Sequence, residues 1–407
     1  MRHPVPVAVS PAPTGSRPAP SATRVALVVA AAHGLTDGYA AFLAPLLPRI
    51  MDRLSLSIAL AATLAMTFSL AASLLQPLLG YLADRHGRRA FLVAGPLVSG
   101  VFVSLMGLAP NFWTLVLILM AAGLGSASFH PPGASYAARV SEGRGSGGRY
   151  SIFSFGGSAG FAIGPLVAVG LVSRGGLEGL WVAMIPVLLL TPVFYLNLPR
   201  GSHDRAVHAP PRPVEVLRHL RGTLGLVFGV SAALAWAQRT YVTLIPIVVA
   251  DAGGSETLGA LVLTVFNAAQ AAGTLAGGAM ADRMDRRRLL VGLCVLAFPA
   301  YVAAVALAPG SVGALVAAAF SGFLGMATLP AIVVMAQEMI PRGTAVGSGI
   351  VMGLAWAAGS VGVLLTGAVA DTIGPTTATL GTMPAILLAA ALAAHPALRR
   401  HPMPSEA

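Results

Sequence analysis

Residues 80–89 read GYLADRHGRR, and residues 278–288 read GAMADRMDRRR, so one short pattern of Gly, Asp and Arg occurs twice in the chain. Other residues recur at the same offset of 198 residues (278 − 80). The matching pairs are Gly80/Gly278, Asp84/Asp282, Pro132/Pro330 and Gly164/Gly362. Several matches at one offset indicate two homologous halves with the same orientation.

The composition is that of a membrane protein. Hydrophobic residues make up 56% of the 407 residues and charged residues 10%, whereas an ordinary soluble domain is about 25% charged. The apolar residues fall into blocks of about 20, which is long enough for a helix to cross the bilayer. The expected spans are 24–46, 57–82, 90–109, 112–137, 149–173, 176–198, 222–250, 257–281, 288–308, 311–337, 344–370 and 375–395.

The spans and the repeat together predict an all-α polytopic membrane protein with twelve transmembrane helices in two pseudo-symmetric six-helix bundles. The expected divisions are a disordered N-terminal tail (1–23), an N-terminal bundle (24–198), a Pro-rich basic linker (199–221), a C-terminal bundle (222–395) and a C-terminal tail (396–407).

The positive charge is distributed unevenly along the chain. The formal net charge of +11 could suggest nucleic-acid binding. With both termini in the cytoplasm, however, every Arg falls on the cytoplasmic side except Arg49, Arg53, Arg174 and the intramembrane Arg239. This asymmetry follows the positive-inside rule. It predicts cytoplasmic termini, a cytoplasmic linker and tails, and no nucleic-acid partner.

The repeated loop motif has a mechanical interpretation. A small Gly80 permits close helix contact, and Asp84 can accept hydrogen bonds from helix amides or from an Arg. We therefore expect a conformational latch, with a purely topogenic basic cluster as the alternative. The latch residues are Gly80, Asp84, Arg85, Gly87 and Arg88, with Asp282 and Arg283 in the second copy.

The doubled motif resembles the helix 2 to helix 3 motif of the major facilitator superfamily. HGLTDGYAAFLAPLLP (33–48), SASFHPPGASYAARV (126–140) and RYSIFSFGGSAGFAIGPL (149–166) are further similar to its fosmidomycin-resistance branch. Members of that branch have a His and an Asp in helix 1, a Phe-His-Pro in helix 4 and a Gly-rich helix 5. The resemblance implies a proton-driven drug or metabolite exporter of the inner membrane.

Two ionisable residues, His33 and Asp37, lie one turn apart in the first span. Asp37 is about 20 Å along that helix, close to the bilayer centre, where a charged carboxylate is costly. We expect this pair to carry the coupling proton. The alternatives are a static pair that fixes helix packing and a contact with substrate alone.

His130 precedes two prolines in the fourth span, toward its cytoplasmic end. The prolines free backbone carbonyls, which are tolerated where a cavity or protein covers them. A role in binding substrate or protons is expected, with a structural kink as the alternative. No metal site is expected from His33, Asp37 and His130, because the histidines lack close ligand spacing and are expected at different depths.

Arg239 lies well inside the seventh span and requires an anion, which Asp37 or an anionic substrate can supply. Its planar guanidinium suits phosphonate or carboxylate groups. Snorkelling to the interface is the alternative. The expected substrate-binding set is Arg239, His130, Gln238, Tyr241, Trp236, Asn267 and Gln270.

The fifth span is rich in glycine. Small residues four apart permit close helix contact and Pro adds a bend, so this span is expected to form a seam that rocks between the halves. A static packing seam is the alternative. The seam residues are Gly157, Gly160, Gly164 and Pro165.

The resemblance, taken together with these features, favours proton-coupled efflux by alternating access, with the lipid bilayer, a small-molecule substrate and protons as partners and no cofactor. A proton-coupled importer of an organic anion or sugar keeps the same fold. A membrane enzyme is disfavoured because the sequence has no phosphate-binding loop, His-Glu-x-x-His pair or nucleophile elbow. A non-transporting sensor would need a soluble signalling domain, and the expected tails are short.

Overall fold

The computed structural model describes residues 21–140, 146–199, 218, 220–340 and 347–400. Most of the expected tails and linker, including 1–20, 200–217 and 401–407, lies outside these residues. The described part is helical and contains no strand. The first half has α1 (Ala22–Ala40), α2 (Leu43–Leu54), α3 (Ile58–Leu74), α4 (Gln76–His86), α5 (Arg88–Leu105), α6 (Phe112–Val140), α7 (Ser146–Gly175) and α8 (Met184–Asn197).

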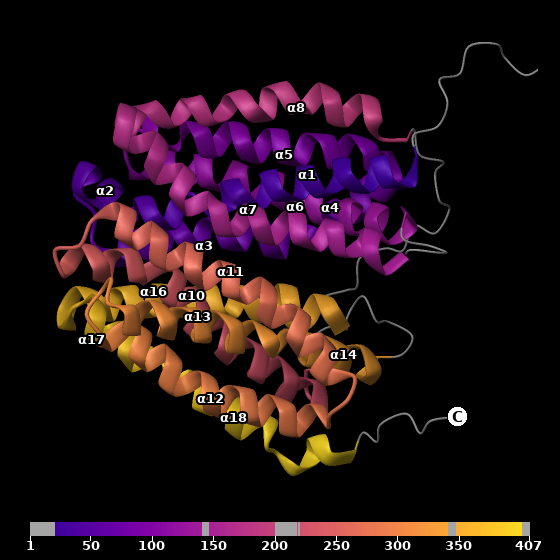
Figure 1. Ribbon diagram of the computed structural model, residues 1–407, viewed down its shortest axis with the longest axis vertical. Coiled ribbons are helices and arrows are strands. Elements are labelled where there is room, and N and C mark those ends of the chain that lie inside the picture. Colours follow the sequence, from indigo (N-terminus) through magenta and orange to yellow (C-terminus); the bar gives the residue numbers. More distant parts are fainter. Residues whose placement is uncertain (1–20, 141–145, 200–217, 219, 341–346, 401–407) are drawn as a thin grey trace, which may run out of the picture.

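The second half repeats this plan. It has α10 (Thr223–Asp251), α11 (Glu256–Ala281), α12 (Arg286–Ala306), α13 (Val312–Ala327), α14 (Leu329–Met339), α16 (Ala355–Ile373), α17 (Pro375–Thr382) and α18 (Pro384–Ala393). A π-helical turn, Gly349–Leu354, leads into α16. Figure 1 shows the two halves as separate groups of roughly parallel rods, one indigo to magenta and one orange to yellow.

The number of membrane-crossing helices agrees with the twelve spans expected from the sequence. Eleven helical segments in the described chain are long and apolar enough to cross a membrane, and α3 with α4, bent by 43°, brings the number to twelve when counted as one span. Large apolar side chains on the outside, such as Trp113 at 73% and Leu275 at 70% exposure, suit contact with lipid. The prediction of a twelve-helix membrane protein in two related halves is confirmed.

Serine caps fix where several helices begin, because a side-chain oxygen satisfies an amide that the helix leaves open. Ser57 accepts from Leu60 N at 3.3 Å, and Ser255 accepts from Leu258 N at 3.2 Å. These two caps lie at equivalent positions of the repeat, so the two halves start their second long helix in the same way.

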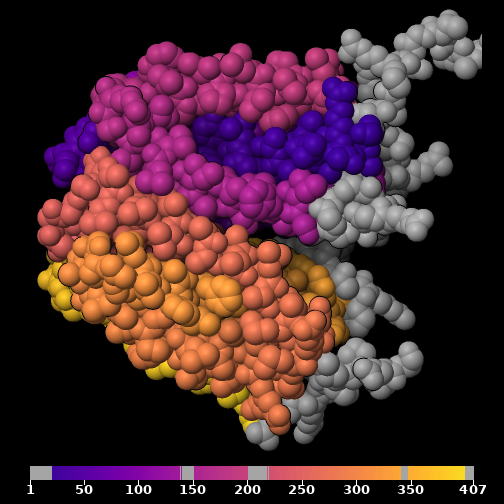
Figure 2. Space-filling view, in the orientation of Figure 1, coloured from indigo at the N-terminus to yellow at the C-terminus, as the bar shows by residue number. Residues whose placement is uncertain are grey.

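The molecule has two distinct ends. We call the end where α1 begins and α18 ends the terminal end, and the end where α2 meets α3 the far end. The two groups of helices converge toward the far end (Figure 1). In the space-filling view the halves meet along a continuous boundary, with magenta atoms of the first half against coral atoms of the second (Figure 2).

Candidate functional site

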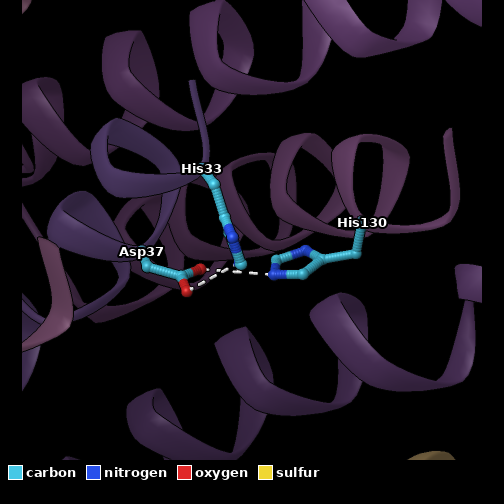
Figure 3. Close-up of side chains that lie close together, drawn as sticks. All are labelled: His33, Asp37 and His130. Atoms are coloured by element: carbon cyan, nitrogen blue, oxygen red, sulfur yellow. Dashed lines mark ion pairs between the residues drawn. The ribbon is translucent and has the colours of Figure 1, made fainter. Parts of the chain in front are cut away.

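Three ionisable side chains meet in the first half (Figure 3). His33 and Asp37 come from α1, and His130 comes from α6. Asp37 Oδ2 lies 3.1 Å from His33 Nε2, and Asp37 Oδ1 lies 3.2 Å from His130 Nε2. The side chains of His33, Asp37 and His130 are 13%, 18% and 30% exposed. Each carboxylate oxygen therefore faces one imidazole nitrogen in a largely buried cluster.

The other nitrogen of each imidazole is held by a backbone carbonyl. His33 Nδ1 lies 3.0 Å from the Phe153 carbonyl oxygen, and His130 Nδ1 lies 2.8 Å from that of Ser126. A carbonyl oxygen only accepts hydrogen bonds, so each Nδ1 carries a hydrogen and donates it. A neutral imidazole with hydrogen on Nδ1 presents a lone pair at Nε2.

This arrangement makes the contacts with Asp37 dependent on added protons. If both imidazoles are neutral and the carboxyl is ionised, two Nε2 lone pairs face carboxylate oxygens and no hydrogen bond forms. A contact at 3.1 or 3.2 Å is a hydrogen bond only when a proton occupies Nε2 or the carboxyl oxygen. The geometry thus suits a cluster that takes up and releases protons.

Gly157 of α7 provides the space for this cluster. A Cβ built there would lie 2.4 Å from His33 Cε1 and 2.7 Å from Asp37 Oδ2, so any larger residue would displace the pair. The ring of Phe153, one turn earlier in α7, stacks on His33 with centroids 4.3 Å apart and planes 20° apart. Phe153 therefore orients the His33 ring through its backbone and its side chain together.

The expectation that the histidines lie at different depths is wrong. Helix α1 runs away from the terminal end and α6 runs toward it. His33 follows Ala22 by 11 residues and His130 precedes Val140 by 10, which places both about 15 Å from that end. Ligand atoms of His33, Asp37 and His130 all lie within 4.8 Å of one another, so depth gives no argument against a metal ion at this cluster.

The glycine seam of α7 does not lie between the halves, contrary to expectation. A Cβ at Gly160 would lie 1.9 Å from the Gly34 carbonyl oxygen, and one at Gly164 would lie 2.5 Å from that of Gly38. Both contacts join α7 to α1 within the first half, and Pro165 follows inside α7. A different face of α7 meets the second half, where Asn267 Nδ2 donates to the Phe161 carbonyl at 3.1 Å. The repeat of small residues identified a tight seam but could not identify its partner helix.

Arg239 of α10 is a partly buried cation in the second half. Its Nε is buried without a hydrogen-bond partner, and its guanidinium carbon lies 5.0 Å from the ring centroid of Trp356 in α16. No ion pair joins it to a carboxylate within the described residues, and the ion pairs of Asp37 are those with its two histidines. The expected Arg239–Asp37 pair is therefore not formed. Trp356 was missed, because nothing in its sequence spacing links it to Arg239.

The other expected substrate contacts are not gathered into one patch. Gln238, which precedes Arg239 in the sequence, has its Nε2 3.7 Å from Met326 Sδ. Trp236 donates from Nε1 to Thr366 Oγ1 at 3.0 Å. The interpretation of Tyr241 as a substrate contact does not fit this conformation: its side chain is 0% exposed and packs on Phe266 with ring centroids 4.6 Å apart.

The two remaining members of that set lie on α11. Asn267 is buried and bonded to α7 as described above, with its Oδ1 lacking a partner. Gln270 is half-buried one turn further along. The Asn267 side chain therefore belongs to the boundary between the halves rather than to the surroundings of Arg239.

The first loop motif is built as a compact junction between α4 and α5. Asp84 pairs with Arg88 across the loop, and Arg88 Nη1 donates to Ser135 Oγ of α6 at 2.9 Å. Gly87 has φ of +113°, a conformation that L side chains rarely adopt. A Cβ at Gly80 would lie 3.1 Å from Pro131 Cβ, which is the expected close helix contact.

The second copy differs from the first. A Cβ at Gly278 would meet nothing within 4 Å, and Asp282 forms no ion pair among the described residues. Arg286, which corresponds to Arg88, pairs instead with Glu338 of α14 at 2.7 Å. Arg283 is exposed. The two copies differ in backbone as well as in ionic partners, because Asp285, which corresponds to Gly87, has φ of −59°.

Two related halves of apolar helices, with a largely buried His-Asp-His cluster inside one of them, are the architecture of a multi-pass membrane transporter. The profile of the Major Facilitator Superfamily matches residues 28–349. This chain belongs to that superfamily.

Relatives and solved structures agree with this membership. The chain is 26% identical over 377 residues to the uncharacterized MFS-type transporter YfnC of Bacillus subtilis, covering 89% of this chain and 90% of that protein. It is 26% identical over 303 residues to the fosmidomycin resistance protein of Escherichia coli, covering 73% and 74%. A bacterial homologue of the human lysosomal transporter Spinster, in an inward-facing and unoccupied conformation, superposes with a TM-score of 0.77 at 19% identity, covering 93% and 97%.

Proposed function

We propose that this protein is a proton-coupled exporter of a small anionic drug or metabolite, and that it works by alternating access in the plasma membrane with cytoplasmic termini. The observation that carries the proposal is the cluster of His33, Asp37 and His130. Its Nδ1 atoms are committed to carbonyls, so its contacts to Asp37 form and break with proton loading. The name of the fosmidomycin resistance protein, a relative of this chain, agrees with an export role.

Proton loading would change how α1, α6 and α7 are held together. With protons on the Nε2 atoms, charge-assisted hydrogen bonds join α6 to α1 through Asp37. Without them, lone pairs repel and these contacts weaken. Because α7 carries the carbonyl that holds His33 and also contacts α11 in the second half, the change reaches the boundary between the halves.

Arg239 is the proposed anion-binding group. A guanidinium whose Nε has no protein partner gains a hydrogen bond when a carboxylate or phosphonate arrives. The neighbouring Trp356 ring supports the cation in the absence of an anion. Binding of a proton in the first half and of an anion in the second half would then occur on opposite sides of the boundary.

The energy available is adequate for export. A membrane potential of about 100 mV supplies roughly 2.3 kcal/mol for each charge moved, which is about a 50-fold concentration ratio. A pH gradient would add to this. The loop motif, with Asp84 paired to Arg88, is the proposed latch at the terminal end.

The test is proton flux in liposomes that contain a pH-sensitive dye. Fosmidomycin and a panel of organic anions serve as probes, because the natural substrate is unidentified. We expect at least one probe to trigger proton movement in the wild type and in Asp52→Asn, a matched change at an exposed carboxylate of α2. Asp37→Asn is expected to abolish it.

The sidedness of the flux separates export from import. In an exporter, protons move against the probe; in an importer of an organic anion or sugar, protons and probe move together. Probe-triggered flux that survives Asp37→Asn would contradict the assignment of the cluster.

A further inference from the structure

Apart from the Asn267–Phe161 contact midway along α11 and α7, the polar contacts between the halves that involve charged side chains gather at the far end. Both carboxylate oxygens of Asp371, near the end of α16, accept hydrogen bonds from the first amides of α3: Ile58 N at 2.7 Å and Ala59 N at 3.0 Å. The next amide, Leu60 N, is taken by Ser57 of α3 itself. The N-terminus of α3 is thus capped jointly by its own serine and by a carboxylate from the other half.

A second contact crosses the boundary beside it. Arg49 Nε of α2 donates to Glu256 Oε1 at 2.6 Å, and Glu256 lies in the first turn of α11. An acidic residue in the first turn also favours its own helix through the helix dipole. Each of these two cross-boundary contacts therefore holds a carboxylate at a helix N-terminus.

Small side chains lie beneath these polar contacts. A Cβ at Gly367 of α16 would lie 2.6 Å from Ala62 Cβ of α3, so the two helices touch where both residues are small. Deeper still, Ser69 Oγ of α3 and Ser360 Oγ of α16 are 2.7 Å apart. Ala62 and Ser69 lie four and eleven residues after Ile58 along α3, and Gly367 and Ser360 lie four and eleven residues before Asp371 along α16, so the contacts form one antiparallel seam.

The terminal end lacks a comparable set among the described residues. Its ion pairs, Asp84–Arg88 and Arg286–Glu338, each remain within one half. Along the same seam toward that end, a Cβ at Gly353 would come no closer than 3.9 Å to the Ser73 carbonyl oxygen. The described polar contacts between the halves therefore favour closure at the far end.

We propose that Asp371, through its cap on α3, and the Gly367–Ala62 contact beneath it form a gate that closes the far end and sets the balance between the two alternating-access states. This inference rests on the proposed transport cycle for its purpose. When the far end opens, α3 loses the two hydrogen bonds from Asp371 and keeps only the cap from Ser57. Asp371 is thus a positioning residue: it holds the gate and is remote from the proton cluster.

The test measures distances by double electron–electron resonance with spin labels on Cys294→Ala protein, which removes the single native cysteine. Leu108→Cys with Leu307→Cys reports on the far end, and Leu196→Cys with Met284→Cys reports on the terminal end; all four positions are exposed. The measurement requires neither a substrate nor a proton gradient. If the proposed transport function is wrong, the flux assay therefore fails while the distance measurement still tests the gate.

The variants are Asp371→Ala and Gly367→Val, each with a matched control. Asp52→Ala removes an exposed carboxylate from the same end, and Gly381→Val adds a side chain where a Cβ meets nothing within 4 Å. A lost N-cap typically shifts an equilibrium by about fivefold. We expect Asp371→Ala to raise the ratio of far-end-open to far-end-closed protein by about this factor, and Gly367→Val to raise it further.

The two label pairs separate gate opening from general loosening. Opening predicts a longer far-end distance together with a shorter terminal-end distance, with both controls unchanged. Unchanged far-end distances in both folded variants would overturn the proposal. Lengthening at both ends, or the same change in the controls, would also overturn it.

Discussion

Replacing Gly157 with Ala is expected to disable the proton cluster while leaving the helix intact. The added methyl group would lie 2.4 Å from His33 Cε1, 2.5 Å from His33 Nε2 and 2.7 Å from Asp37 Oδ2. Ordinary contact requires about 1 Å more, so either the His33 ring or α7 must move. A ring displaced by about 1 Å leaves the 3.1 Å contact with Asp37 outside hydrogen-bond range.

The size of the effect follows from the bond that is lost. A hydrogen bond to a charged group contributes about 1.5–3 kcal/mol, so the proton affinity of the cluster should change by about 10- to 100-fold. Overpacking costs about 1–3 kcal/mol of stability, while Ala in place of Gly inside a helix returns about 1 kcal/mol. The net loss in the free energy of unfolding is therefore smaller than the free energy lost from proton binding at the cluster.

Gly170→Ala is the matched control in the same helix, because its Cβ would meet only Arg174 Nη1, at 3.8 Å. Proton flux in liposomes and proton uptake by the purified protein after a pH step are measured for both variants. We expect both signals to fall at least tenfold in Gly157→Ala and to remain at wild-type values in Gly170→Ala. Wild-type signals in Gly157→Ala would refute the cluster geometry.

Three further predictions concern the second half and the loop motif. Arg239→Lys should raise the probe concentration for half-maximal flux by about tenfold, because the charge remains but the planar fork is lost; unchanged affinity would argue against anion binding. Tyr241→Phe should leave flux unchanged and shift the free energy of unfolding by under about 1 kcal/mol, since the hydroxyl has no partner in its buried site; a loss of probe affinity would restore Tyr241 as a substrate contact. Asp84→Ala should slow transport a few-fold by removing an ion pair whose side chains are 22% and 27% exposed, while Asp282→Ala should have little effect in initial-rate assays; equal effects would indicate a shared role for the two motif copies.

The fold was predictable because its determinants are local or periodic. Apolar blocks of membrane length and the exact recurrence of Gly80 and Asp84 as Gly278 and Asp282 require no knowledge of packing. The His33–Asp37 contact was also predictable, since residues four apart share one helix face.

The remaining features depend on which helices become neighbours. His130 joins the cluster because α6 runs antiparallel to α1, and the glycines of α7 face α1 rather than the second half. The cap from Asp371 onto α3 joins residues 313 apart in sequence, with no local signal. Tertiary packing decides which helices become neighbours, and a single sequence contains no local signal for it.

If Asp37 and its two histidines form the site where protons and substrate are coupled, substrate binding must displace protons from this cluster. Proton release is measured on purified, detergent-solubilised protein when a probe that drives flux is added, and is followed with a pH indicator in weakly buffered solution. We predict release from the wild type and from Asp52→Asn, and none from Asp37→Asn that still binds the probe. Equal release from Asp37→Asn would contradict the claim and move the coupling site away from the cluster.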